Sequence, residues 1–271
     1  MDRLINECKN AFQKVREISP LVHNITNYVA ANDVANIQLA MGASPIMADD
    51  CLECAEITAI AKALTINIGT LNSRTVESMI ISGKTANSMG KPVVLDPVGA
   101  GASAFRNDTI QKILSDIKVS VIKGNISEIS FIAGLSSSTK GVDVSAEDLG
   151  NDKILAAKAV SEKYNCVCAI TGETDIIYFG GRIAQIKNGC KMLSNVTGTG
   201  CMTTGLLGGF SAVCEPFTAA VTAISAMGIA GELSFEKYGT VGAGSFHIGL
   251  IDEISRMNAE IFEERAKIYE L

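Results

Sequence analysis

The stretch "SNVTGTGCMTTGLLGGF", residues 194–210, points most directly to chemistry. Gly198, Thr199 and Gly200 form a turn just before an apolar run of helical character. The free N–H groups at a helix N-terminus attract anions, so this turn predicts a phosphate cradle. It is not a Walker loop, because Leu206 stands where that motif has lysine. The alternative is a capped helix that packs closely through glycine, and Cys201 at the junction is explained by neither interpretation alone.

Polar residues also follow four predicted strands, at the points where these strands end. Ligands bind beyond the carboxyl ends of parallel strands, so four such ends in order predict one site. Carboxylates suit Mg²⁺, which keeps several waters and takes few protein ligands, and a lysine can neutralise phosphate charge. The residues concerned are Asn67, Asp96 in "DPVGAG", Lys123, Asn125 and Glu128 in "KGNISE", and Thr171 in "TGETD".

Several of these residues have a structural interpretation as well. Asp96 precedes a proline and could simply form an Asx turn, while Lys123 and Glu128 could mark a solvated helix start. "VLDPVGAGASA" imitates a dinucleotide-binding fingerprint, but Pro97 interrupts it and no acidic residue follows at the expected distance. We therefore favour a magnesium–phosphate role for Asp96 over NAD binding.

A polar cluster, "HNITN" at residues 23–27, precedes a predicted helix and could bind a small polar ring. His23 is more often a structural hydrogen-bonding residue than a catalyst in such a position.

The eight cysteines, in a chain that starts without an export signal, favour reduced thiols and a cytoplasmic location. Cys51 and Cys54 form a C-x-x-C pair, but a zinc site needs more ligands and the chain has only two histidines. Cys166 and Cys168 alternate as strand residues that face the same side. A thiol-dependent redox or metal-binding protein remains the alternative from a different functional class.

The elements that must position these residues alternate between short apolar runs and helical stretches, which predicts a mostly parallel α/β sheet. Helical periodicity is clear near the N-terminus and over residues 33–42 and 73–89, and the chain after Gly200 is expected to be helical to its end. "GGR" at residues 180–182 predicts a hairpin. Strands are expected at residues 44–48, 63–68, 92–96, 119–124, 166–171, 176–180 and 182–187.

Composition and charge limit the classes of protein to which this chain can belong. Hydrophobic residues make up 47% of the 271, enough for a large core, and residues 1–271 show no linker or repeat, so we expect a single domain. A net charge of −6 argues against a nucleic-acid partner. The most apolar stretch, residues 202–231, is interrupted by Glu215 and Pro216, so two buried helices and no membrane partner are expected.

Seven motifs in order, "HNITN", "MGASPIMA", "NIGTL", "VLDPVGAGASAFR", "KGNISEI", "ITGETD" and "NVTGTGCM", resemble the hydroxyethylthiazole kinase family of thiamine salvage. The similarity runs from about Pro20 to the C-terminus. It implies a ribokinase-like three-layer α/β/α sandwich without a lid domain. It also implies transfer of the ATP γ-phosphoryl group, with Mg²⁺, to the hydroxyl of 4-methyl-5-(2-hydroxyethyl)thiazole, in a homotrimer whose thiazole sites lie between subunits.

The resemblance also implies roles for individual residues. Met47, Gly198 and Asn24 are expected at the thiazole, Lys123, Asn125 and Thr171 near the ATP phosphates, and Asp96 and Glu128 at the magnesium–phosphate cluster. Gly198, Thr199 and Gly200 are expected to form the anion hole, with Cys201 beside the acceptor hydroxyl. Lys123 departs from the family, in which arginine is expected, and loses bidentate geometry.

Cys201 occupies the position at which related sugar kinases carry an aspartate as the presumed base. Phosphoryl transfer has a loose transition state in which alignment matters more than early deprotonation. We therefore expect Cys201 mainly to position the hydroxyl. A sister kinase that acts on another small alcohol, such as hydroxymethylpyrimidine, is the second interpretation.

Overall fold

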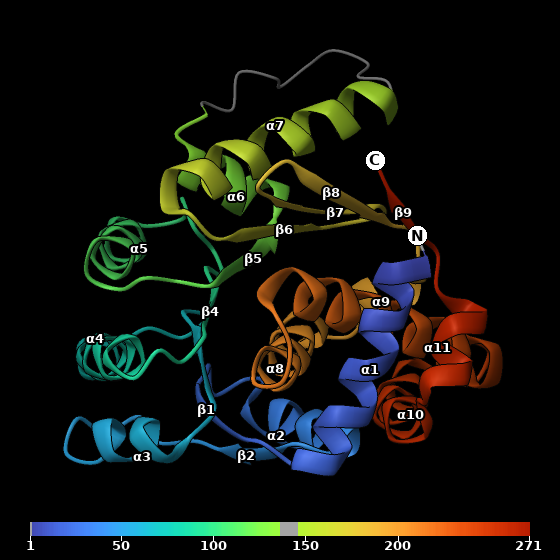
Figure 1. Cartoon of the computed structure of the whole chain (residues 1–271), viewed down its shortest axis with the longest axis horizontal. Helices are drawn as coiled ribbons and strands as arrows, with labels where there is room; N and C mark the ends of the chain where they lie inside the picture. The colour runs from blue at the N-terminus through green and yellow to red at the C-terminus, as the bar shows by residue number, and fades with distance from the viewer. Residues whose placement is uncertain (1, 136–145) are drawn as a thin grey trace.

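The computed structural model describes residues 2–135 and 146–271, in which nine strands form a single sheet with helices on both faces (Figure 1). The strand order is β2-β1-β3-β4-β5-β6-β7-β8-β9; the first six strands are parallel and the last three are added antiparallel. The expected mostly parallel sheet is confirmed. The strands are β1 (Leu21–Ile25), β2 (Ser44–Ile46), β3 (Ala63–Asn67), β4 (Val93–Asp96), β5 (Val121–Asn125), β6 (Val167–Thr171), β7 (Asp175–Phe179), β8 (Arg182–Ile186) and β9 (Ile268–Glu270).

Helices cover both faces of this sheet and complete a three-layer sandwich (Figure 1). One face carries α1 (Asp2–Ile18), α2 (Ala31–Met41), α8 (Thr199–Ser211), α9 (Pro216–Tyr238), α10 (Ala243–Arg256) and α11 (Ala259–Arg265). The other carries α3 (Cys54–Ile60), α4 (Ser73–Ser88), α5 (Ala104–Asp116), α6 (Ile126–Ala133) and α7 (Ala146–Tyr164). A 3₁₀ helix, η1 (Lys191–Asn195), precedes α8. In the described residues all strands belong to the one sheet, so no separate lid sheet is present there.

The side-chain alternation of the central strands decides which residues face α8. Leu64, Ile66 and Leu95 belong to the core under α4 and α5, while their neighbours along each strand point to the opposite face. Polar side chains interrupt the apolar pattern on that opposite face toward the carboxyl ends of four strands. These are Asn24 on β1, Thr65 and Asn67 on β3, Asp96 on β4 and Lys123 on β5.

Helix α8 lies directly against this face because glycine leaves no side chain in the way. A Cβ built on Gly208 would lie 2.4 Å from Thr65 Cγ2, and one on Gly209 would lie 2.7 Å from Met41 Sδ. The later glycines of the run therefore serve packing. Close packing brings the first turn of α8 to the carboxyl ends of β3, β4 and β5, where the polar side chains lie.

Two elements differ from the sequence prediction. "HNITN" is not only a cluster before a helix: His23 and Asn24 lie in β1, whose polar residues break the apolar run typical of a buried strand. The chain after Gly200 is not helical to its end, because Ile268–Glu270 forms β9, which pairs antiparallel with β8. Pairing with a distant strand outweighs local periodicity here.

Other expectations are confirmed. Gly180 and Gly181, with φ of +56° and +84°, make the two-residue turn between β7 and β8. Cys166 and Cys168 lie in the same core cluster. Among the described residues, only helix α9 is long and apolar enough to cross a membrane, and 89% of its most apolar window is buried inside the protein. It is thus a core helix of the sandwich.

Candidate active site

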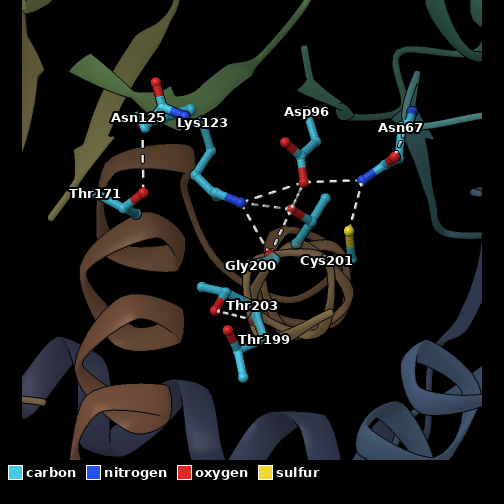
Figure 2. A network of polar contacts seen from close by, with 12 residues as sticks. Asn67, Asp96, Lys123, Asn125, Thr171, Thr199, Gly200, Cys201 and Thr203 are labelled. Carbon is cyan, nitrogen blue, oxygen red and sulfur yellow. Dashed lines mark hydrogen bonds and ion pairs between the residues drawn. The ribbon is translucent and has the colours of Figure 1, made fainter. Parts of the chain in front are cut away.

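The N-terminus of α8 is open toward the carboxyl ends of the strands (Figure 2). Gly198 is its N-cap residue, with φ of +86°, a left-handed conformation that glycine adopts without strain. No side chain caps the helix, and the Thr199 hydroxyl instead donates to the Leu193 carbonyl at 3.1 Å. With no side-chain cap in place, the first N–H groups of α8 can donate to a bound anion, as the predicted anion hole requires.

A buried ion pair between Asp96 and Lys123 lies beneath this helix start (Figure 2). Lys123 Nζ is 3.2 Å from Asp96 Oδ2, 2.9 Å from the Gly200 carbonyl and 3.1 Å from Thr204 Oγ1. The three ammonium protons therefore each have an acceptor inside the protein. Asp96 Oδ2 also accepts from Thr204 Oγ1 at 2.6 Å and from Asn67 Nδ2 at 2.9 Å. Lysine, with three separate donors, ties the carboxylate of β4 to the first turn of α8.

Cys201 is half-buried beside this ion pair, one residue into the helix from Gly200 (Figure 2). Its Sγ accepts from Asn27 Nδ2 and from Asn67 Nδ2, each at 3.2 Å. Burial raises the pKa of the thiol above its ordinary value, and the nearby Asp96 carboxylate raises it further. The thiol is therefore protonated at neutral pH, a poor state for a general base.

Glu128 joins two loops at the edge of the site. Its Oε1 accepts from the Gly99 N–H and its Oε2 from the Asn125 N–H, both at 2.8 Å. The Asn125 side chain in turn accepts from the Glu128 N–H at 3.0 Å, completing a capping box at the start of α6. Thr171 pairs with Asn125 across β5 and β6. The loop after β4, the start of α6 and the end of β6 are thereby brought together.

The two remaining residues of the predicted thiazole set lie near each other at the edge of the sheet: His23 pairs with Ile46, and the Asn24 amide lies 3.5 Å from the Ile46 carbonyl, directly before Met47. Met47 follows β2 and is 38% exposed. Asn24 is buried, and its amide is already engaged by Gln38, Thr65 and backbone carbonyls. The structure brings Gly198, Thr199, Gly200, Cys201, Asp96 and Lys123 together at the start of α8, with Asn125, Glu128 and Thr171 at the neighbouring strand ends. Asn24 is instead linked to a later turn of α8 through Gln38, which donates to the Gly205 carbonyl.

Two contacts of the site, Asn27 and Thr204, are not predicted from the sequence. Asn67 is one of the predicted polar strand ends, whereas Asn27 belongs to the polar cluster at residues 23–27. Thr204 lies one helical turn beyond Gly200, so its i+4 spacing could have placed it on the same face.

The carboxylates of the site suit a magnesium ion that binds together with the phosphates of a nucleotide. They do not suit a magnesium ion held by protein ligands alone. Among the described residues, no group of three or more His, Cys, Asp or Glu side chains could hold a metal ion. Mg²⁺ needs only one or two carboxylates when phosphate oxygens and waters supply its other ligands. No described residue donates to Asp96 Oδ1, which leaves that oxygen for this purpose.

Comparison with known proteins decides the family. The sequence model of the hydroxyethylthiazole kinase family matches residues 12–260. The chain belongs to the hydroxyethylthiazole kinase family. A relative with the family's name, from Ruminiclostridium cellulolyticum, is 56% identical over 273 residues, covering 100% of both chains. A hydroxyethylthiazole kinase structure from Pyrococcus horikoshii is 41% identical, with a TM-score of 0.89, and covers 97% of this chain and 98% of that one.

A more distant structure identifies the architecture of this hydroxyethylthiazole kinase family member. A ribokinase-like superfamily protein from Enterococcus faecalis, 11% identical, matches with a TM-score of 0.62 over 93% of this chain and 89% of its own. The ribokinase-like sandwich is therefore confirmed. Membership of a kinase family over the whole chain leaves no support for the alternative of a redox or metal-binding thiol protein.

Proposed function

We propose that this chain transfers the γ-phosphoryl group of ATP to the hydroxyl of 4-methyl-5-(2-hydroxyethyl)thiazole, as the name of its relatives implies. The observation that carries the proposal is the uncapped N-terminus of α8 above the Asp96–Lys123 pair. Phosphoryl transfer relies mainly on alignment and on stabilising charge, and this arrangement offers both. The N–H groups that follow Gly198 face the anion, and Cys201 marks the side from which the alcohol approaches.

The loops at the neighbouring strand ends are proposed to hold the nucleotide. Thr171 and Asn125 are the candidates for contacts near the ATP phosphates, and Asp96 and Glu128 for holding Mg²⁺ directly or through water. When bound, Mg²⁺ neutralises charge on the transferring phosphates. For Lys123 to contact ATP, its ammonium group must give up one of its three hydrogen bonds, to Asp96, to Gly200 or to Thr204, and donate to a phosphate oxygen instead. Glu128 also holds the Gly99 loop against the start of α6 through its two backbone contacts.

We also propose a homotrimer with sites between subunits. Large apolar side chains lie exposed beside the site: Tyr28 and Val29 in the turn between β1 and α2, Leu39 on α2, Met47 directly after β2, and Ile248 on α10. Monomers seldom expose so many large apolar side chains on neighbouring elements, and a subunit packed there would cover Met47 at the thiazole end. Light scattering after gel filtration tests this, with three times the mass of the chain expected.

We also propose a cytoplasmic location, since all eight cysteines are free thiols in the structure.

The test of the activity is incubation with Mg·ATP and a panel of small alcohols, with products separated by mass. The thiazole alcohol is expected to yield a phosphate monoester at the highest kcat/KM. Preference for hydroxymethylpyrimidine would instead support the sister kinase. No phosphorylated alcohol from any member of the panel would contradict the proposal.

A further inference from the structure

Two asparagines, Asn27 and Asn67, touch the sulfur of Cys201. Asn27 follows β1 and Asn67 ends β3, so they flank the point at which the strand order reverses. Both side chains are almost fully buried, and each places Nδ2 at 3.2 Å from Cys201 Sγ. A thiol between two carboxamides has a defined set of hydrogen-bond partners.

The surroundings fix which end of the Asn67 amide faces the sulfur. Its Oδ1 lies 2.9 Å from the Gly69 N–H, which can only donate, and its Nδ2 lies 2.9 Å from Asp96 Oδ2, which accepts. The reversed amide would set donor against donor at Gly69 and acceptor against acceptor at Asp96. The group that contacts Cys201 is therefore an N–H donor (Figure 2).

The same reasoning fixes Asn27. Its Oδ1 accepts from the Ala30 N–H at 3.0 Å, so its Nδ2 faces both Asn67 Oδ1, at 2.9 Å, and Cys201 Sγ. Gly69 allows this close approach, because a Cβ there would lie 2.9 Å from Asn27 Nδ2. The sulfur thus receives two N–H donors from amides that cannot turn over.

We propose that Asn27 and Asn67 are positioning residues that occupy the acceptor capacity of Cys201 and leave its S–H to donate to the oxygen of the acceptor alcohol. The inference rests on the proposed kinase function and deepens it. The alcohol oxygen accepts the S–H bond while its other lone pair forms the new O–P bond, and the bond from the γ-phosphorus to ADP breaks with its electron pair leaving on ADP. The alcohol's own proton passes to a phosphoryl oxygen, and the thiol keeps its proton throughout.

A double-mutant cycle tests this. Asn27→Leu removes one donor at similar volume, and its effect is measured in the native background and in the Cys201→Ala background. With the thiol present we expect kcat/KM to fall roughly five- to tenfold, mostly in kcat, as for the loss of one hydrogen bond. In the Cys201→Ala background, no further loss beyond about twofold is expected. Equal losses in both backgrounds would show a merely structural role and overturn the proposal.

Gly69→Ala provides a second variant in case Asn27→Leu does not fold. Its Cβ displaces the Asn27 amide without removing any polar group, and the same dependence on Cys201 is expected. Additive losses for this variant would count against the proposal in the same way. Asn10→Leu is the control, because Asn10 is an exposed residue of α1, which lies outside both the site and the proposed subunit contact.

An infrared readout separates this proposal from the proposed function. The difference spectrum between native protein and Cys201→Ala isolates the S–H stretch of Cys201 without any turnover. Adding the thiazole alcohol alone should move this band to lower frequency, and Asn27→Leu should abolish the movement. An absent or unmoved band in an enzyme that makes the phosphate ester would refute the positioning role. Failure of native protein to make the ester would instead refute the kinase function.

Discussion

Thr204→Val removes the shortest hydrogen bond of the Asp96–Lys123 pair while keeping the shape of the side chain. The hydroxyl donates to Asp96 Oδ2 at 2.6 Å and accepts from Lys123 Nζ at 3.1 Å, and Thr204 is 2% exposed. A hydrogen bond to a charged group contributes about 1.5–3 kcal/mol, and valine leaves the buried Asp96 oxygen without this donor. We therefore expect unfolding free energy to fall by about 2–3 kcal/mol, or Tm by roughly 4–8 °C.

Thr203→Val is the matched control for this change. Thr203 is the preceding residue of α8, is 6% exposed, and donates at 2.8 Å only to the Thr199 carbonyl of its own helix. Such back-bonds add little to stability, so a loss below about 1 kcal/mol is expected. Thermal and urea unfolding of both variants are compared at one protein concentration, because assembly shifts apparent stability. Equal losses for the two variants would refute the view that Thr204 acts through the ion pair.

Four further predictions concern titration and individual residues of the site. Burial raises the pKa of Asp175 from 3.8 to about 7, so its contribution to stability is complete below about pH 4 and is lost as pH rises through about 7. Asp175→Asn should therefore be more stable than the native chain at pH 8 by at most about 4 kcal/mol and should flatten the pH dependence of Tm; an unchanged dependence would contradict this. Because Cys201 is a protonated thiol, Cys201→Ala should retain measurable turnover and Cys201→Asp should not be inactive, whereas undetectable turnover of Cys201→Ala with normal thiazole binding would restore the base role. Glu128→Gln can accept only one of its two backbone N–H bonds, so KM for Mg·ATP should rise more than KM for the alcohol, and equal changes would speak against this linkage. Asp96→Ala should be more severe than Cys201→Ala in kcat/KM and in magnesium dependence.

Much of the sheet could be predicted because its strands are short apolar runs buried on both faces. Strand β1 could not, since His23 and Asn24 break its apolar pattern while making buried hydrogen bonds that the sequence does not show. Strand β9 could not, because only pairing with β8 makes its three residues a strand.

The residues of the site also fall into those that the sequence predicts and those that it does not. The strand ends and the glycine turn before α8 predicted which polar residues the structure brings together, because parallel strands bring their carboxyl ends to one edge of the sheet. The partners of Cys201 were beyond such rules: Asn27 is 174 positions away and Asn67 is 134. Contacts over such separations depend on how α8 packs on the sheet, which its glycines permit but do not specify.

Transfer of labelled phosphate from γ-³²P-ATP to the thiazole alcohol, compared between native protein and Asp96→Asn, tests the central claim most directly. The account predicts label in a thiazole phosphate ester with native protein. It predicts a loss of at least about a hundredfold with Asp96→Asn, as expected for a main charged group in phosphoryl transfer. Absence of labelled ester with native protein, or equal rates for the two proteins, would contradict a phosphoryl-transfer site at the start of α8.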